Sequence, residues 1–436
     1  MQKTVIGRLA AAVLAMGVVA ACGSGAESAD PPSGGTGGET GGGLAVATEA
    51  DTVDAAPGDG TCADADGACS LRAAVQEADA AGGGTVTLPA GTYTLGIDGI
   101  DEDEGATGDL DITSAVTIDG PDATIDAAGL DRALDVLEGG ALTLTGVTVT
   151  GGSAQGEGMP ASGGGIRNAG ELTADGATIT GNTAVRAGGG IEAVAGSTTE
   201  LTGVTLSDNE TGPGPGNGGG LHITESGTVT VTDSMITGNR AAAEGGGLWN
   251  DTMSTMTVTG STISGNTASG DEATMGGGGL FTVGGELTVR DSEVTDNVAD
   301  GMAGSGGGAL NDDGTLVVEN TTFSGNTAVR AGGAIEANIG TTEVSGTTMT
   351  GNSTGDSPGN GGGVHLTGAG TVTVDGGEVT GNTAANQGGG LWNSAPGTMT
   401  VTGTDVSGNE APTGPDLYQD GDGTGFTVDG EVVPAG

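Results

Sequence analysis

Residues 256–266 read Met-Thr-Val-Thr-Gly-Ser-Thr-Ile-Ser-Gly-Asn, and the pattern in this stretch decides the fold. Apolar Met256 and Val258 alternate with threonines, as they do in a strand that has one apolar face. The alternation stops at Gly260, resumes after it and ends at Asn266. The stretch therefore predicts strands of a few residues, separated by corners at Gly or Asn.

Nine copies of this pattern run through the chain, each following a glycine-rich triplet and an apolar residue. The closing asparagines are Asn182, Asn209, Asn239, Asn266, Asn297, Asn326, Asn352, Asn382 and Asn409. Their spacings are 27, 30, 27, 31, 29, 26, 30 and 27 residues. A nearly constant period in this range predicts an architecture in which each repeat stacks on the one before it.

Parallel stacking places strands about 4.8 Å apart and puts like residues over like. We expect rows of Val, Ile and Leu inside the stack and rows of Thr outside it. Asparagine at a corner tolerates the left-handed backbone conformation and can stack as a hydrogen-bonded ladder. The glycine triplets are expected at tight corners where a Cβ atom would clash.

A longer period lies over the short one. A distance of 143 residues separates His222 from His365 and also Trp249 from Trp392. A block of five repeats has therefore been duplicated, and each of these residues occurs twice for that reason.

Composition limits the core and the partners. The chain has 96 glycines but only 3 Phe, 2 Trp and 2 Tyr, so its core must be thin and aliphatic. The formal charge is −48, from 57 acidic and 9 basic residues, which argues against a nucleic-acid partner and against polyanionic substrates. The acidity is interpreted either as a means of solubility or as a specific role in cation binding.

The N-terminal residues indicate export. Residues 1–21 have a short basic start and an apolar run too short to span a bilayer, which predicts a signal peptide. Residues 19–23 read Val-Ala-Ala-Cys-Gly and resemble the lipobox of bacterial lipoproteins, which implies lipidation of Cys22. Residues 22–44 would then be a lipidated flexible linker. The alternative is a plain signal peptide with a chance cysteine.

Residues 45–112 are predicted to form an N-terminal cap and the first coils. Cys62 and Cys69 are expected to form a disulfide outside the cytoplasm, with free thiols as the alternative. A short amphipathic helix is predicted to begin after Ser70 and to stop at Gly82. Its apolar face would cover the open end of the core.

Four segments of the chain together carry a resemblance to a known family. Residues 69–72 (Cys-Ser-Leu-Arg), 87–93, 108–112 and 130–132 are similar to the N-terminal region of bacterial surface proteins of the CSLREA type. The resemblance covers roughly residues 59 to 412 and implies a right-handed parallel β-helix of the pectate-lyase-like class. Ala73 replaces the glutamate that usually continues the motif. The family mostly lacks an assigned activity, so the resemblance implies a fold rather than a reaction.

His222, His365, Trp249 and Trp392 are the candidate ligand-contact residues. The two histidines lie five coils apart, roughly 24 Å at 4.8 Å per coil, so they cannot form one catalytic or metal-binding pair. We expect them to be repeated surface or packing residues. Two interpretations of the tryptophans stay open, because an indole can stack on a sugar ring or pack under a loop.

The spacing of the acidic and cationic residues along the sequence does not indicate a catalytic centre. The segment 98–104 could bind calcium weakly through its carboxylates, but it lacks a calcium-loop spacing and is interpreted as a solvated loop. Asp312 and Asp313 are interpreted as turn residues rather than as a glycosidase acid pair. A lyase needs cationic groups beside its base, yet Lys3 is the only lysine and the arginines are scattered. We predict no catalytic residues, no metal site and no cofactor beyond weak calcium binding.

The sequence thus predicts an all-β protein, a right-handed parallel β-helix (solenoid) with an N-terminal capping helix. Repeats would occupy residues 113–412 and a C-terminal cap residues 413–436. The predicted function is a non-catalytic cell-surface lipoprotein, serving as a stalk or as an adhesin-like, glycan-contacting module. Its partners would be the membrane, through the lipid anchor, and surface glycans or other surface proteins. The alternative is a carbohydrate-active enzyme, either a polysaccharide lyase or a glycoside hydrolase, on the same fold.

Overall fold

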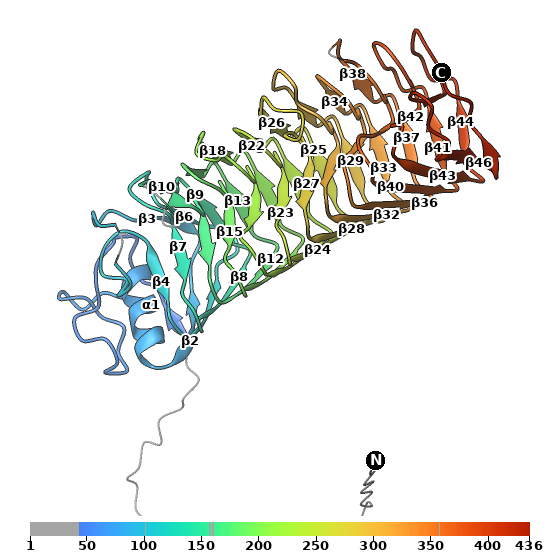
Figure 1. The fold of residues 1–436 in the computed structure, drawn as a ribbon. Coiled ribbons are helices and arrows are strands. Elements are labelled where there is room, and N and C mark those ends of the chain that lie inside the picture. Colours follow the sequence, from blue (N-terminus) through green and yellow to red (C-terminus); the bar gives the residue numbers. More distant parts are fainter. Residues whose placement is uncertain (1–42, 101, 157, 159–160, 357) are drawn as a thin grey trace, which may run out of the picture. The chain divides into compact units, whose positions relative to one another are not determined.

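The computed structural model describes residues 43–100, 102–156, 158, 161–356 and 358–436. The predicted signal peptide and the lipidation of Cys22 lie outside these residues. No helix among the described residues is long and apolar enough to cross a membrane. From residue 43 onward the chain is a right-handed parallel β-helix in which each coil stacks on the preceding one (Figure 1).

The helix α1 (Leu71–Ala80) confirms the predicted capping helix. The hydroxyl of Ser70 accepts a hydrogen bond from the backbone N–H of Ala73 at 3.0 Å, and Gly82 follows in the left-handed conformation. Apolar residues on one face of α1, such as Val75, are buried in the same core cluster as the first coils. The expected disulfide joins Cys62 to Cys69 immediately before the helix.

The coils of the β-helix contribute strands to four sheets, here named A to D. Along the chain, the strands of a full coil belong to sheets A, B, D and C in that order. Sheet A has strands β1 Leu44–Ala45, β2 Gly83–Thr87, β5 Ala115–Asp119, β8 Ala141–Thr145, β12 Glu171–Asp175, β16 Thr198–Thr202, β20 Thr228–Thr232, β24 Thr255–Thr259, β28 Glu286–Arg290, β32 Thr315–Glu319, β36 Thr341–Ser345, β40 Thr371–Asp375, β43 Thr398–Thr402, β46 Phe426–Val428 and β47 Glu431–Val432. All neighbours pair in parallel except β47, which turns back antiparallel on β46.

The other three sheets have shorter strands. Sheet B has β3 Gly91–Thr94, β6 Ala123–Asp126, β9 Thr148–Thr150, β13 Thr178–Thr180, β17 Thr205–Ser207, β21 Met235–Thr237, β25 Thr262–Ser264, β29 Glu293–Thr295, β33 Thr322–Ser324, β37 Thr348–Thr350, β41 Glu378–Thr380 and β44 Asp405–Ser407. Sheet D has β10 Ser153–Ala154, β14 Thr183–Ala184, β18 Glu210–Thr211, β22 Arg240–Ala241, β26 Thr267–Ala268, β30 Val298–Ala299, β34 Thr327–Ala328 and β38 Ser353–Thr354. Sheet C has β4 Leu110–Ile112, β7 Leu134–Val136, β11 Ile166–Asn168, β15 Ile191–Ala193, β19 Leu221–Ile223, β23 Leu248–Asn250, β27 Leu280–Val283, β31 Ala309–Asp312, β35 Ile335–Ala337, β39 Val364–Leu366, β42 Leu391–Asn393 and β45 Leu417–Gln419.

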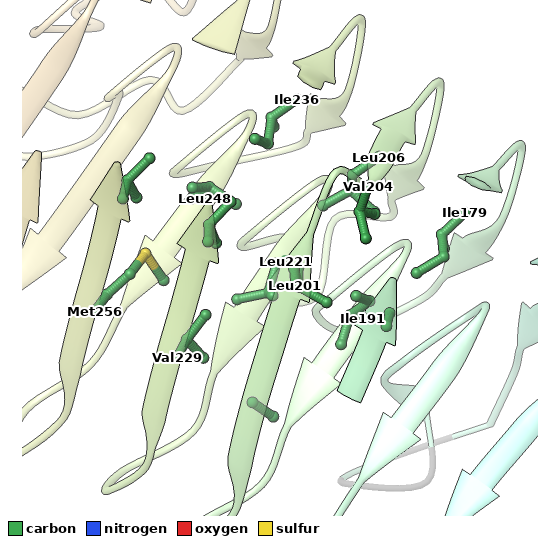
Figure 2. Close-up of a cluster of buried hydrophobic side chains, with 14 of the residues drawn as sticks. Ile179, Ile191, Leu201, Val204, Leu206, Leu221, Val229, Ile236, Leu248 and Met256 are labelled. Carbon is green, nitrogen blue, oxygen red and sulfur yellow. The ribbon is translucent and has the colours of Figure 1, made fainter. Parts of the chain in front are cut away.

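The core is filled by rows of aliphatic side chains, as predicted. Val229 on β20 lies over Met256 on β24, and Leu206 on β17 lies over Ile236 on β21. Rows from sheets A, B and C point into the same interior (Figure 2). Because inward residues alternate with exposed or half-buried threonines on sheet A, the two faces of that sheet separate as the sequence predicts.

The nine corner asparagines form a continuous hydrogen-bonded ladder, which confirms the predicted stacking. Within each pair, the side-chain oxygen of one asparagine accepts from both the backbone N–H and the Nδ2 of the preceding one. For Asn239 and Asn266 both distances are 3.0 Å. The Nδ2 of Asn266 also donates at 2.9 Å to the carbonyl of Ile236, so the side chain is fully used. The ladder begins at the N–H of Gly152 and ends on the carboxylate of Asp416.

The corner asparagines do not use the left-handed conformation that their residue type tolerates. The left-handed conformation belongs to the residue before each asparagine and not to the asparagine itself. That residue is Gly181, Asp208, Gly238, Gly265, Asp296, Gly325, Gly351, Gly381 or Gly408, with φ between 53° and 66°. The physical reason is that the chain must turn before the asparagine, so that the asparagine side chain points inward along the stack.

Replacing Asn266 by Ala should destabilise the protein by about 2–5 kcal/mol, because two buried donors of Asn239 and the carbonyl of Ile236 lose their partner. Denaturant unfolding followed by circular dichroism measures the change. Asp416→Asn is the control, since it keeps the acceptor oxygen for Asn409. Equal stability of Asn266→Ala and the wild type would show that the ladder does not stabilise the stack.

Candidate functional site

Both histidines, both tryptophans and several buried acids lie in one row along sheet C. The middle residue of each strand lies over the middle residue of the next, and by alternation it points away from the main core. In order, the row is Asp111, Asp135, Arg167, Glu192, His222, Trp249, Phe281, Leu310, Glu336, His365, Trp392 and Tyr418. Both histidines and both tryptophans of the chain belong to it. We call this set the sheet C row.

The glycine-rich triplets cover the sheet C row. The first glycine of a triplet, such as Gly245, has a positive φ of 62° and passes directly over the row. A Cβ atom on Gly245 would lie 2.8 Å from the Cβ of Trp249, so only glycine lets the loop approach this closely. A Cβ on the next residue, Gly246, would lie 2.3 Å from the carbonyl oxygen of Gly278. The expected clash is confirmed. Every member of the sheet C row except half-buried Arg167 is buried.

The duplication has produced two similar polar clusters in the row. In the first, Nδ1 of His222 lies 3.0 Å from Glu192, whose carboxylate also accepts from the hydroxyl of Thr224 and faces Arg186 at 3.7 Å. In the second, His365 lies 2.9 Å from Glu336, which accepts from the hydroxyl of Thr367 at 2.8 Å and faces Arg330 at 3.5 Å. The two histidines therefore each have their own partners, as expected from their separation.

Aromatic stacking uses the ring faces of both tryptophans. Trp249 is stacked between His222, with ring centroids 4.2 Å apart, and Phe281, with centroids 5.9 Å apart. Trp392 has the same arrangement between His365 and Tyr418. A sugar ring needs a free indole face, so of the two interpretations the one in which the tryptophans pack under a loop fits the structure.

The histidines are equally unavailable. Both imidazoles are 2% exposed, and each lies against the tryptophan of the next coil. Nε2 of His365 is buried and has no hydrogen-bond partner among the described residues, so this nitrogen does not reach solvent as a base. The prediction that these are packing residues agrees with this placement. As ligand contacts, all four candidates are disfavoured by burial.

One difference separates the two copies. Nε1 of Trp249 donates to Glu244 at 3.1 Å, whereas Nε1 of Trp392 donates to Gln387 at 3.2 Å. Burial raises the pKa of the Glu244 carboxyl, and the negative charge of Asp312 raises it further. The hydrogen bond from the indole of Trp249 lowers this pKa and so opposes both effects. The first copy therefore holds an ionisable group where the second holds a neutral one.

At its N-terminal end the row enters a cluster of buried charges. One carboxylate oxygen each from Asp109, Asp111 and Asp135 lies within 4.8 Å of the others. Arg132 contacts Asp109 at 2.8 Å and Asp135 at 3.8 Å, and Arg167 contacts Asp135 at 3.0 Å. Burial, opposed by Arg132, raises the pKa of Asp109 to about 8. Burial, opposed by the N–H of Gly105 and reinforced by Asp135, raises the pKa of Asp111 to about 7.

A buried arginine ties the N-terminal cap to this cluster. Arg72 pairs with Asp51 at 2.7 Å and donates to the backbone carbonyls of Gly105, Gly108 and Asp109. The arginine of the Cys-Ser-Leu-Arg motif is fully buried, and it fixes the loop that leads into β4. Its position explains why this residue type is needed, since only a planar group with five donors can reach so many acceptors.

The remaining candidates are structural. Asp313 has a φ of 63° in the turn after β31, and Asp312 accepts from Asn338 at 3.0 Å, so the turn interpretation agrees with the structure. Asp98 and Asp103 are exposed. Exposed arginines also have partners, since Arg240 lies 3.6 Å from Asp300.

The comparisons agree with this geometry. Residues 131–311 match the family model described as right handed beta helix region. The chain contains a β-helix region of that kind. Residues 320–338 match the Chlamydia polymorphic membrane protein repeat, and no curated protein matches the chain in sequence.

Two solved structures are similar to this β-helix. The first is PfbA, a surface adhesin of Streptococcus pneumoniae, with 13% identity, a TM-score of 0.45, and coverage of 87% of this chain and 93% of that one. The second is DFA-IIIase from Arthrobacter chlorophenolicus A6 without its lid, with 12% identity, a TM-score of 0.30, and coverage of 83% of this chain and 87% of that one.

Sequence reasoning missed the acidic members of the row. Glu192 and Glu336 are fully buried, yet neither lies in a sequence motif that indicates a functional site. A signal was present, because each stands alone between two apolar residues directly after a glycine-rich triplet, as His222 and His365 do. When the repeats are aligned on their glycine-rich triplets, Glu192, His222, Glu336 and His365 occupy the same repeat position.

Replacing Glu244 by Gln should raise the melting temperature by roughly 1–3 °C at pH 8 and leave it unchanged at pH 4. The folded protein holds the Glu244 proton more tightly than the unfolded chain does. Stability from this group is therefore present below its ordinary pKa of 4.5 and lost as the pH rises through the raised value. Gln387→Glu is the matched control and should lower the melting temperature at pH 8. If Glu244→Gln gave the same shift at both pH values, ionisation would not be the cause.

Proposed function

We propose that this chain is a non-catalytic extracytoplasmic surface module, held to a membrane through lipid on Cys22. The β-helix would act as a stalk that presents its exposed faces to surface glycans or to other surface proteins. The linker at residues 22–44 would separate the folded part from the membrane.

The covering of the sheet C row carries this proposal. Catalysis of glycoside cleavage or elimination needs an acid, a base or a cationic group that reaches the substrate. Here the two histidines, the glutamates beside them and the N-terminal aspartate cluster are all at most 6% exposed. The hydrogen bonds and ring faces of the histidines and of the glutamates beside them are directed at neighbouring residues of the protein. These histidines and glutamates stabilise the covering of sheet C by loops and are not presented to a substrate.

The exposed side of sheet A supports a binding role. Thr228, Thr230 and Thr232 on β20 lie over Thr255, Thr257 and Thr259 on β24. Their hydroxyls repeat about every 4.8 Å between coils and about every 6.6 Å along a strand. Each hydroxyl can donate and accept a hydrogen bond, which suits a hydroxyl-rich ligand such as a glycan.

A glycan-array screen of the full chain, run beside reducing-sugar and unsaturated-uronate assays on the same polysaccharides, tests the proposal. We expect glycan binding without turnover. Thr230→Ala with Thr257→Ala should weaken that binding, whereas Thr178→Ala on sheet B is the matched control and should not. Turnover of any polysaccharide, lost on His222→Ala or Asp111→Asn, would favour the enzyme interpretation and refute this one.

Replacing Cys22 by Ala should move the protein from the membrane pellet to the soluble fraction, because the acyl anchor is lost. Cell fractionation with immunoblotting measures the distribution. A variant with Cys62→Ala and Cys69→Ala is the control and should stay in the pellet. A wild-type protein found in the soluble fraction would contradict lipid anchoring while leaving the binding role open.

A further inference from the structure

Asp111 has an unused oxygen deep in the protein. Its Oδ2 accepts from the N–H of Gly105 at 2.8 Å, but its Oδ1 has no hydrogen-bond partner among the described residues. The residue is only 3% exposed. A buried carboxylate oxygen without a donor is costly, and an isolated one calls for a compensating positive group.

The neighbouring carboxylates have the spacing of a cation site. The oxygens of Asp109, Asp111 and Asp135 lie within 4.8 Å of one another. Two oxygens that bind one calcium ion at 2.3–2.6 Å can be no more than about 5.2 Å apart. The three aspartates come from two adjacent coils, Asp111 and Asp135 on β4 and β7 and Asp109 just before β4. They can therefore meet one ion without a change of fold.

Two arginines lie beside the three aspartates. Arg132 contacts Asp109 and Asp135, and Arg167 contacts Asp135. Carboxylates that accept from a guanidinium keep further lone pairs for a cation. With Asp131 included, four buried aspartates lie in this region beside the two arginines.

A recess beside α1 gives access to Asp111. It has a volume of about 280 Å³, and its lining includes Asp79, Asp103, Glu104 and Asp111. The lining holds four carboxylates and no basic residue, so its potential attracts cations. The recess supplies an entry path and further oxygen ligands at its mouth.

We propose that Asp111 is the central ligand of a divalent-cation site, with Asp109 and Asp135 as its companions, and that the cation is calcium. Calcium fits because the available donors are all oxygens and because it tolerates irregular geometry. Bound there, the ion would join the loop before β4 to the first two coils, next to the contacts of Arg72. The weak calcium binding expected at residues 98–104 would thus centre on Asp111 instead.

Thermal unfolding of the full chain in EDTA and in 5 mM calcium chloride tests this site, with sodium chloride added to equal ionic strength. The variant is Asp111→Asn, which keeps the shape and the acceptor for Gly105. The control is Asp98→Asn, which removes one charge from an exposed residue of the nearby loop. Isothermal titration calorimetry with calcium chloride measures affinity and stoichiometry.

Calcium should raise the melting temperature of the wild type and of Asp98→Asn by several degrees, with one ion bound at a Kd of about 10⁻⁴ to 10⁻³ M. Asp111→Asn should melt no lower than the wild type in EDTA, yet lose the calcium shift and bind at least ten-fold more weakly. Equal shifts in all three proteins would show general screening of negative charge and overturn the site. No shift in the wild type would overturn it as well. If Asp111→Asn does not fold, Asp135→Asn and the wild-type stoichiometry decide in the same way.

Discussion

Parallel stacking of each coil on its neighbour is the constraint on which the whole structure depends. Because the strands of all four sheets pair in register, every side chain lies between its counterparts one coil before and one coil after. A residue is tolerated only if it is compatible with those two neighbours. Apolar residues and asparagine satisfy this condition with their own kind, since apolar side chains pack and amides both donate and accept. Like charges do not, so a buried acid needs a different neighbour.

The sheet C row shows how the chain meets this constraint with polar residues. Glu192 lies between Arg167 and His222, and His222 lies between Glu192 and Trp249. Each neighbour offers a donor or a ring face. Asp111 over Asp135 is the exception, with two carboxylates in adjacent coils, and the negative charge of Asp135 adds to the effect of burial in raising the pKa of Asp111.

The repeat period, the aliphatic rows, the capping helix and the asparagine ladder could be predicted because each rests on a pattern longer than one strand. Strands of sheet A span five residues, so the alternation of Thr and Val identifies their faces. Strands of sheet C mostly span three residues and are buried on both sides, so they show no alternation. The burial of Trp249 could not be read from its own neighbourhood, because the loop that covers it comes from Gly245 and depends on a backbone conformation. The same holds for Asp109 and Asp111, whose surroundings are built by residues from α1 to β11.

The ladder of asparagines has a direction, because the side-chain oxygen of each asparagine accepts hydrogen bonds from the asparagine one coil before it. Asp416 can receive such bonds but cannot continue them, so it acts as a terminator. Any number of whole repeats could in principle be inserted between Gly152 and Asp416 without altering either end. The length of this protein is therefore free to evolve by copying of repeats, and the duplicated block of five is one such event preserved in the chain.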